Sequence, residues 1–76
     1  MTFDINEYWG VTVSHADLIG RNQWRAKAWV FRRDDFRKIG PPHIGNGATS
    51  NLADEHALAE ARQSIFTLGT PAKWKQ

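Results

Sequence analysis

The chain contains no cysteine, so it can hold no disulfide, no thiolate zinc site and no cysteine nucleophile. No apolar run approaches the ~18 residues that a membrane-spanning helix needs. The N-terminus does not combine positive charge with an apolar stretch, as a secretory signal peptide would. These absences predict a soluble cytoplasmic protein that does not associate with membranes.

Residues suited to catalysis are also scarce. Asp34 and Asp35 are adjacent carboxylates, but a polar turn is an ordinary place for aspartates. The three histidines, His15, His43 and His56, do not stand at a recognisable metal-ligand spacing. A domain of this length buries only ~60% of its unfolded surface, which leaves little room for a deep pocket. We therefore expect no enzymatic activity, no metal and no cofactor.

Aromatic residues, by contrast, are plentiful. They make up 12% of the chain, which is too much apolar surface for a disordered protein with a formal net charge of only +2. The 76 residues fit one small domain. We expect residues 1–69 to form a single α+β domain, followed by a basic C-terminal tail, residues 70–76.

Apolar and polar residues alternate in the first part of the chain. Trp9, Val11 and Val13 share odd positions. A period of two with aromatic and β-branched residues predicts a half-buried strand that begins near Glu7 or Tyr8. A connection of about eight residues is expected next, marked by three residues typical of turns: Asp17, Gly20 and Asn22.

A second strand is predicted for residues 23–31. All four even positions are apolar, whereas the odd positions mix cations with aromatic rings. Residues 32–35 then form a polar turn whose length suits a hairpin. The even positions should face the core, and they are Trp24, Ala26, Ala28 and Val30.

The third predicted strand is short and covers residues 36–39. It should stop at Gly40-Pro41-Pro42, because proline lacks the amide proton that a strand ladder needs. Phe36 and Ile39 have opposite parity, so the sequence leaves open which side of the sheet each one takes.

The last predicted element is a helix. Ser50 or Asn51 can cap its first turn, near which Asp54 and Glu55 place negative charge. Gly69 and Pro71 should end it. Apolar residues spaced three and four apart form one stripe along it: Ala57, Leu58, Ala61, Ile65 and Leu68.

The order of elements predicts a β-β-β-α architecture, in which a three-stranded antiparallel meander packs one face against a C-terminal helix. Small residues on both layers should let them approach closely. One helix covers only one face, so the other face must look at water or at a partner. Residues 21–38 carry seven basic and two acidic side chains, which concentrates positive charge near that face.

These features favour a small non-enzymatic interaction module that binds a protein partner, or a second copy of itself, through the open face of the sheet. The alternative is a single-stranded nucleic-acid binder, because cations can contact phosphates while aromatic rings stack on bases. His43, in the loop expected before the helix, is a further candidate for specificity. The predicted binding surface consists of Tyr8, Arg25, Lys27, Trp29, Phe31, Arg32 and Arg33.

Overall fold

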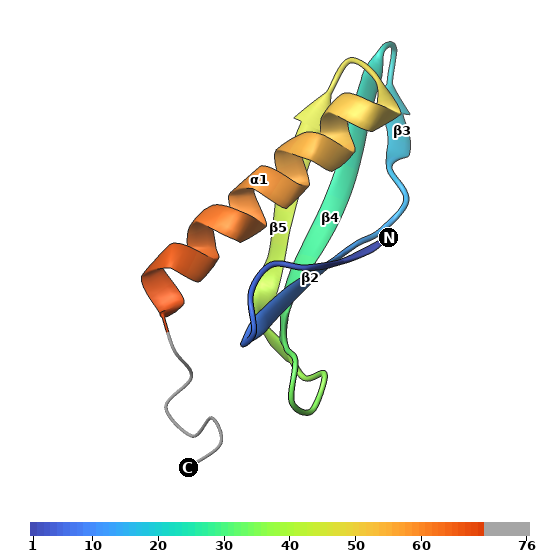
Figure 1. Cartoon of the computed structure of the whole chain (residues 1–76). Helices are drawn as coiled ribbons and strands as arrows, with labels where there is room; N and C mark the ends of the chain where they lie inside the picture. Colours follow the sequence, from blue (N-terminus) through green and yellow to red (C-terminus); the bar gives the residue numbers. More distant parts are fainter. Residues whose placement is uncertain (70–76) are drawn as a thin grey trace.

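One long strand, β4, forms the centre of an antiparallel sheet of five strands, and one helix crosses a face of that sheet (Figure 1). The computed structural model describes residues 1–69, so the predicted basic tail, residues 70–76, and the predicted role of Pro71 lie outside the described residues. The elements follow in the order β1 (Thr2–Asp4), β2 (Trp9–Val13), β3 (Asp17–Gly20), β4 (Gln23–Arg32), β5 (Lys38–Gly47) and α1 (Ser50–Leu68). The predicted α+β class with a C-terminal helix is confirmed, but the predicted three strands are too few.

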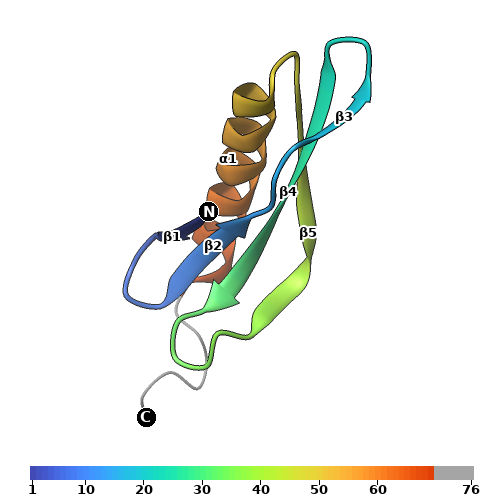
Figure 2. The ribbon, with the colours of Figure 1, turned by 90° about the vertical axis from the view of Figure 1, so that its right-hand side faces the viewer.

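The two edges of β4 are occupied differently. Along one edge it pairs with β5 over most of its length. Along the other edge it pairs first with β3 and then with β2, and β1 lies outside β2. The sheet is therefore long and narrow, with the β3–β4 hairpin at one end and the β4–β5 turn at the other (Figure 2).

The connection predicted between the first two strands contains a strand of its own. Leu18 of β3 lies opposite Trp24, and only Arg21 and Asn22 form the turn that follows Gly20. Asn22 has a φ of 52°, a conformation that asparagine tolerates better than most residues. Of the three residues expected to mark the connection, only Asn22 lies in the turn, because Asp17 and Gly20 are the first and last residues of β3. The turn is therefore much shorter than the eight residues expected.

The N-terminal strand also differs from the prediction. It begins at Trp9, and the residues before it form the separate strand β1 and a turn. The side-chain oxygen of Asn6 stabilises this turn by accepting hydrogen bonds from the backbone N–H groups of Tyr8 (2.8 Å) and Trp9 (2.9 Å).

The strand expected to stop at the prolines instead continues through them. β5 is an edge strand, and its register against β4 shifts between the pairs Ala28–His43 and Val30–Ile39. Pro41 and Pro42 fall inside this irregular segment, where the missing proline N–H groups interrupt no regular ladder. The prediction failed because it treated proline as a stop signal without allowing for a bulge on an edge strand.

The core lies between the sheet and α1, and it is built largely from small side chains. The even positions of β4 face the helix, as predicted, and Ala26 and Ala28 are fully buried. The helix contributes Ala53, Ala57 and Ala61, which are also fully buried. These alanines allow the close approach that the sequence indicated. Larger side chains complete the core: Trp9, Val11, Val13, Val30 and Ile65.

The start of α1 differs from the prediction in two respects, whereas its end was predicted correctly. The N-cap is Thr49, whose side-chain oxygen accepts a hydrogen bond from the Leu52 backbone N–H (3.2 Å), rather than Ser50 or Asn51. Asp54 and Glu55 consequently lie beyond the first turn. The helix ends before Gly69, as predicted, and the Gly69 N–H donates to the Ile65 carbonyl (3.1 Å).

The apolar stripe of α1 is also shifted from the predicted one. Ala53 belongs to the buried stripe, whereas Leu68 is 40% exposed. A spacing of four residues throughout, from Ala53 to Ile65, places the stripe along the sheet. Within residues 1–69, no helix has the length and apolar character needed to cross a membrane.

Candidate functional site

The face of the sheet opposite α1, called the open face below, is covered by no element of residues 1–69. The odd positions of β4 lie on it, opposite Thr12 of β2 and Lys38 of β5. Arg25 and Lys27 are exposed there, and Trp29 is half-buried. The alternation of β4 thus separates an alanine-lined core face from a face of cations and rings, as predicted.

Phe31 lies on the open face but is only 5% exposed. It pairs with Gly10, and its ring occupies the space that a side chain at Gly10 would need. The ring of Phe36 stacks on it with a centroid separation of 5.9 Å and an interplanar angle of 29°. Phe31 therefore forms the base of an aromatic pair and is not itself an exposed binding residue.

Phe36 presents the exposed ring of that pair. It lies in the β4–β5 turn, is 74% exposed and has a φ of 60°. Its N–H donates to the Arg32 carbonyl (2.8 Å), and the Arg37 N–H donates to the side chain of Asp35 (3.0 Å). The turn therefore holds a bulky side chain in a backbone conformation that such residues rarely adopt.

A cation and a second ring lie beside the aromatic pair. The Nζ atom of Lys38 lies 4.7 Å from the ring centroid of Trp29, a cation–π contact. Lys38 is also the cross-strand partner of Phe31. Charge and aromatic surface therefore alternate along this part of the open face.

A small hollow of about 220 Å³ opens on the open face beside the aromatic pair. The hydroxyl oxygens of Thr2 and Thr12 lie 3.5 Å apart at the β1–β2 pairing. The hollow combines aromatic, hydroxyl, carboxylate and ammonium groups, and it is lined by Thr2, Asp4, Thr12, Phe31, Phe36 and Lys38.

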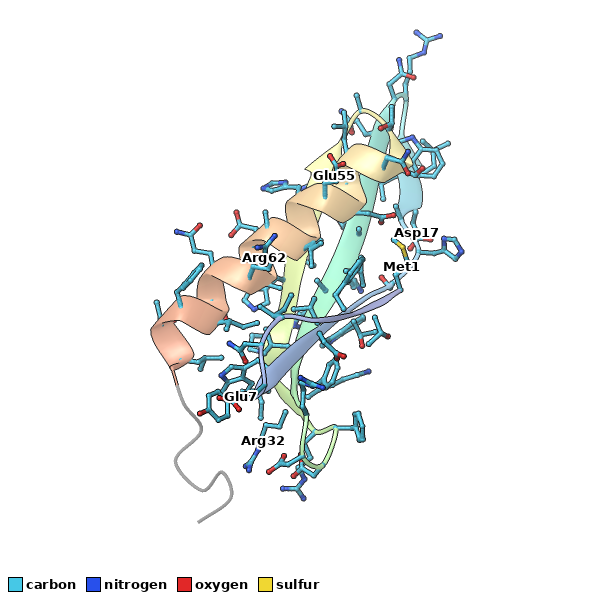
Figure 3. The ribbon with its side chains drawn as sticks, viewed as in Figure 1. Met1, Glu7, Asp17, Arg32, Glu55 and Arg62 are labelled. Atoms are coloured by element: carbon cyan, nitrogen blue, oxygen red, sulfur yellow. The ribbon has the colours of Figure 1, made fainter. Side chains whose placement is uncertain are left out.

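Two arginines of the predicted surface are held by acceptors close to the turn. The Arg32 side chain donates two hydrogen bonds to Asp34 (2.7 and 3.2 Å). Arg32 pairs with Trp9, so it occupies one of the even positions of β4, which lie on the helix side of the sheet. Figure 3 shows Arg32 at the end of the sheet where β4 turns into β5. The hydrogen bond between the two side chains raises the pKa of Arg32 and lowers the pKa of Asp34.

Arg33 ties the β1–β2 turn to the end of β4. Its side chain donates to the Asn6 carbonyl (2.7 Å), and its Nε lies 3.5 Å from Oδ1 of Asp4. Both Arg32 and Arg33 therefore position loops, and neither belongs to the row of open-face cations in which the sequence placed them.

Tyr8 and His43 also lie apart from the open face. Tyr8 packs against the core and lines a hollow of about 460 Å³ with Arg62 and Phe66 of α1. Gly69 is another of the residues that line this hollow. His43 belongs to β5 rather than to a loop, and it pairs with Ala28, whose side chain faces the helix. Of the predicted surface, the structure brings together Arg25, Lys27, Trp29 and Phe31.

Among residues 1–69, no three side chains of the histidine, aspartate or glutamate type are grouped as metal ligands would be. His56 and Glu60 are neighbours on α1, with Nε2 and Oε1 3.4 Å apart. The Nδ1 of His56 accepts a hydrogen bond from the Asn46 backbone N–H (3.1 Å). This contact ties the helix to the outer edge of β5.

Three members of the site were not predicted from the sequence: Phe36, Lys38 and Asp4. The exposure of Phe36 could have been predicted from its position beside a polar turn, because a large ring at such a position is seldom buried in the core. Asp4 and Lys38 reach the open face only through cross-strand pairing with Gly10 and Phe31. Comparison of the chain with protein-family models, curated proteins and solved structures finds no match.

Proposed function

We propose that this chain is a small non-enzymatic binding module and that its open face binds single-stranded nucleic acid. The observation that carries the proposal is the exposed ring of Phe36, which shares one uncovered face with Lys38, Lys27 and Arg25. Of the two ligand classes that the sequence indicated, this arrangement favours the nucleic acid.

The chemistry of the face suits a flexible strand of nucleotides. An aromatic ring stacks on any base and contributes ~1–3 kcal/mol for each base stacked. Lysine and arginine contact phosphates and release counterions, which adds affinity that falls with salt. Trp29, Lys27 and Arg25 follow one another along the open face of β4, and the exposed ring of Phe36 lies beyond them at the end of the strand, so a nucleic-acid strand laid along β4 meets both rings and cations.

The conformation of Phe36 supports a functional role for its ring. A left-handed backbone costs roughly 1–2 kcal/mol for a residue other than glycine. Its 74% exposure means that burial recovers little of this cost. Strained residues of this kind cluster at binding sites, where the surrounding structure holds them in place.

A protein partner or self-association is the second candidate, and a different surface favours it. Leu18 and Ile19 of the edge strand β3 are 60% and 45% exposed, and Leu52 at the start of α1 is 50% exposed. Exposed apolar residues beside an unpaired strand edge suit protein association. A module that works only through this surface would not bind oligonucleotides, so the titration below separates the two candidates.

The test is a fluorescence-anisotropy titration of labelled thymine oligonucleotides of about ten nucleotides. At low salt we expect saturable binding. If Arg25, Lys27 and Lys38 each contact one phosphate, the logarithm of affinity should fall with the logarithm of salt concentration with a slope of about −2. Phe36→Gly should weaken binding by about 5- to 150-fold, because the stacking ring is lost.

The matched control is Phe66→Ala, which removes the other highly exposed phenylalanine, 83% exposed on α1. This variant should bind like the unchanged protein. Phe36→Gly should also fold. Glycine relieves the backbone strain of roughly 1–2 kcal/mol, and this gain offsets the loss of about 0.5–1.5 kcal/mol from the stacking of Phe36 on Phe31. Absence of binding at low salt, or an equal loss in both variants, would refute the proposed function. Tighter binding to a duplex of the same length would refute base stacking.

A further inference from the structure

We propose that the hollow beside Phe36 is a subsite for one unpaired guanine base. This inference rests on the proposed function and adds a base preference to it. A volume of about 220 Å³ lies below the ~300–1,000 Å³ typical of drug-sized ligands, and it suits a single planar ring system. The exposed ring of Phe36, backed by Phe31, offers the surface on which such a base can stack.

Asp4 provides the means to distinguish one base from another. It is one of the residues that line the hollow, its side chain is 64% exposed, and a carboxylate only accepts hydrogen bonds. Guanine carries two adjacent donors, N1–H and the 2-amino group, which match the two carboxylate oxygens. Adenine and cytosine present one amino donor beside an acceptor nitrogen, and thymine and uracil present one N–H between two carbonyls. Two charge-assisted hydrogen bonds therefore favour guanine.

The neighbouring groups fit this assignment. The guanidinium of Arg33 lies 3.5 Å from Oδ1 of Asp4, so it partly neutralises a carboxylate that would otherwise repel the phosphates of the strand. Lys38 lines the same hollow, and its three N–H donors allow it to reach guanine O6, which lies next to N1, while it also contacts a phosphate. The hydroxyls of Thr2 and Thr12 can donate or accept at the edge of the base.

The test compares thymine oligonucleotides that carry one central guanine, adenine, cytosine or hypoxanthine. The guanine oligonucleotide should bind about tenfold more tightly than the thymine, adenine and cytosine versions, in the range that a good bidentate contact gives. Hypoxanthine lacks the 2-amino group, so it should lose most of this preference. In Asp4→Asn, the guanine preference should disappear while affinity for the all-thymine oligonucleotide stays within about twofold.

The matched control is Asp17→Asn, which alters another carboxylate, opposite Arg25 and outside the hollow. It should keep the guanine preference. Equal affinity for all central bases, or a preference that survives Asp4→Asn, would overturn the subsite while leaving the proposed function standing. Failure of every oligonucleotide to bind would overturn the proposed function itself.

Discussion

At Gly45, the backbone of α1 lies directly against the sheet. A Cβ atom added there would lie 2.7 Å from the Ala57 Cα and closer still to backbone atoms of Ala53 and Ala57. Real Cβ atoms essentially never approach backbone so closely. The alanines of the helix and the glycine of β5 therefore act together to set the distance between the two layers.

Gly45→Ala should destabilise the domain by about 1–3 kcal/mol, because the obstructing atoms belong to the helix backbone and cannot rotate away. Urea unfolding followed by circular dichroism measures this. The control is the neighbouring Asn46→Ala, which alters an exposed side chain and should change stability by no more than about 0.5 kcal/mol. Equal stability of the two variants would show that the layers are not in close contact at Gly45.

At the scale of single residues, strand periodicity predicted correctly, for many positions, the face of the sheet on which the side chain lies. It placed Ala26, Ala28 and Val30 in the core and Arg25 and Lys27 on the open face. It could not predict that Phe31 would be buried on the open face, because that depends on a cross-strand glycine and on a ring from the next turn. Such contacts join residues whose pairing the sequence does not reveal.

Among the elements, α1 is fixed at both ends by local interactions. Thr49 satisfies the Leu52 N–H at the start, and Gly69 satisfies the Ile65 carbonyl at the end. Free backbone groups at helix ends need partners of this kind. The boundaries of α1 therefore depend on single capping residues that substitutions can test.

Thr49→Ala should cost about 1 kcal/mol, since the N-cap oxygen is lost. For a domain of this size that lowers the melting temperature by about 4–8 °C. Ser50→Ala is the matched control and should leave the melting temperature unchanged or slightly raised, because Ser50 is the first helical residue and alanine favours helix. A larger loss for Ser50→Ala would mean that the cap lies one residue later.

The elements differ in how well the sequence predicted them. The helix and β4 had long, consistent patterns, so their positions were close to those observed. β1 and β3 are only three and four residues long, too short to give a clear period. β5 contains glycine and proline, whose local preferences were outweighed by pairing along β4.

The whole molecule has two chemically different sides. Glu55 and Arg62 lie on α1 (Figure 3), and acidic side chains predominate over basic ones along that helix. The open face carries Arg25, Lys27 and Lys38 next to aromatic rings. The open face also carries Asp4 and Asp17, but its cations outnumber these two carboxylates, so the formal net charge of +2 conceals an uneven distribution of charge that would orient a polyanion toward the open face.

About half of the candidate site could be predicted from the sequence. The basic and aromatic character of β4 was visible in one segment, so Arg25, Lys27 and Trp29 were identified. Arg32 and Arg33 belong to the same charged segment, but nearby acceptors hold both of them. Composition shows how many cations a segment has. Only the fold shows which of these cations already donate hydrogen bonds to other residues of the protein.

Binding of a nucleic-acid strand to the open face can be followed in amide NMR spectra recorded during titration with a guanine-containing oligonucleotide. We expect amide signals along the open face to shift together with the indole N–H of Trp29, whereas signals of the buried stripe of α1 should stay unchanged. Shifts confined to α1 or to the surface around Leu18 and Leu52, or no shifts at low salt, would show that the open face does not bind the strand. The residues expected to shift are Asp4, Arg25, Lys27, Trp29, Phe36 and Lys38.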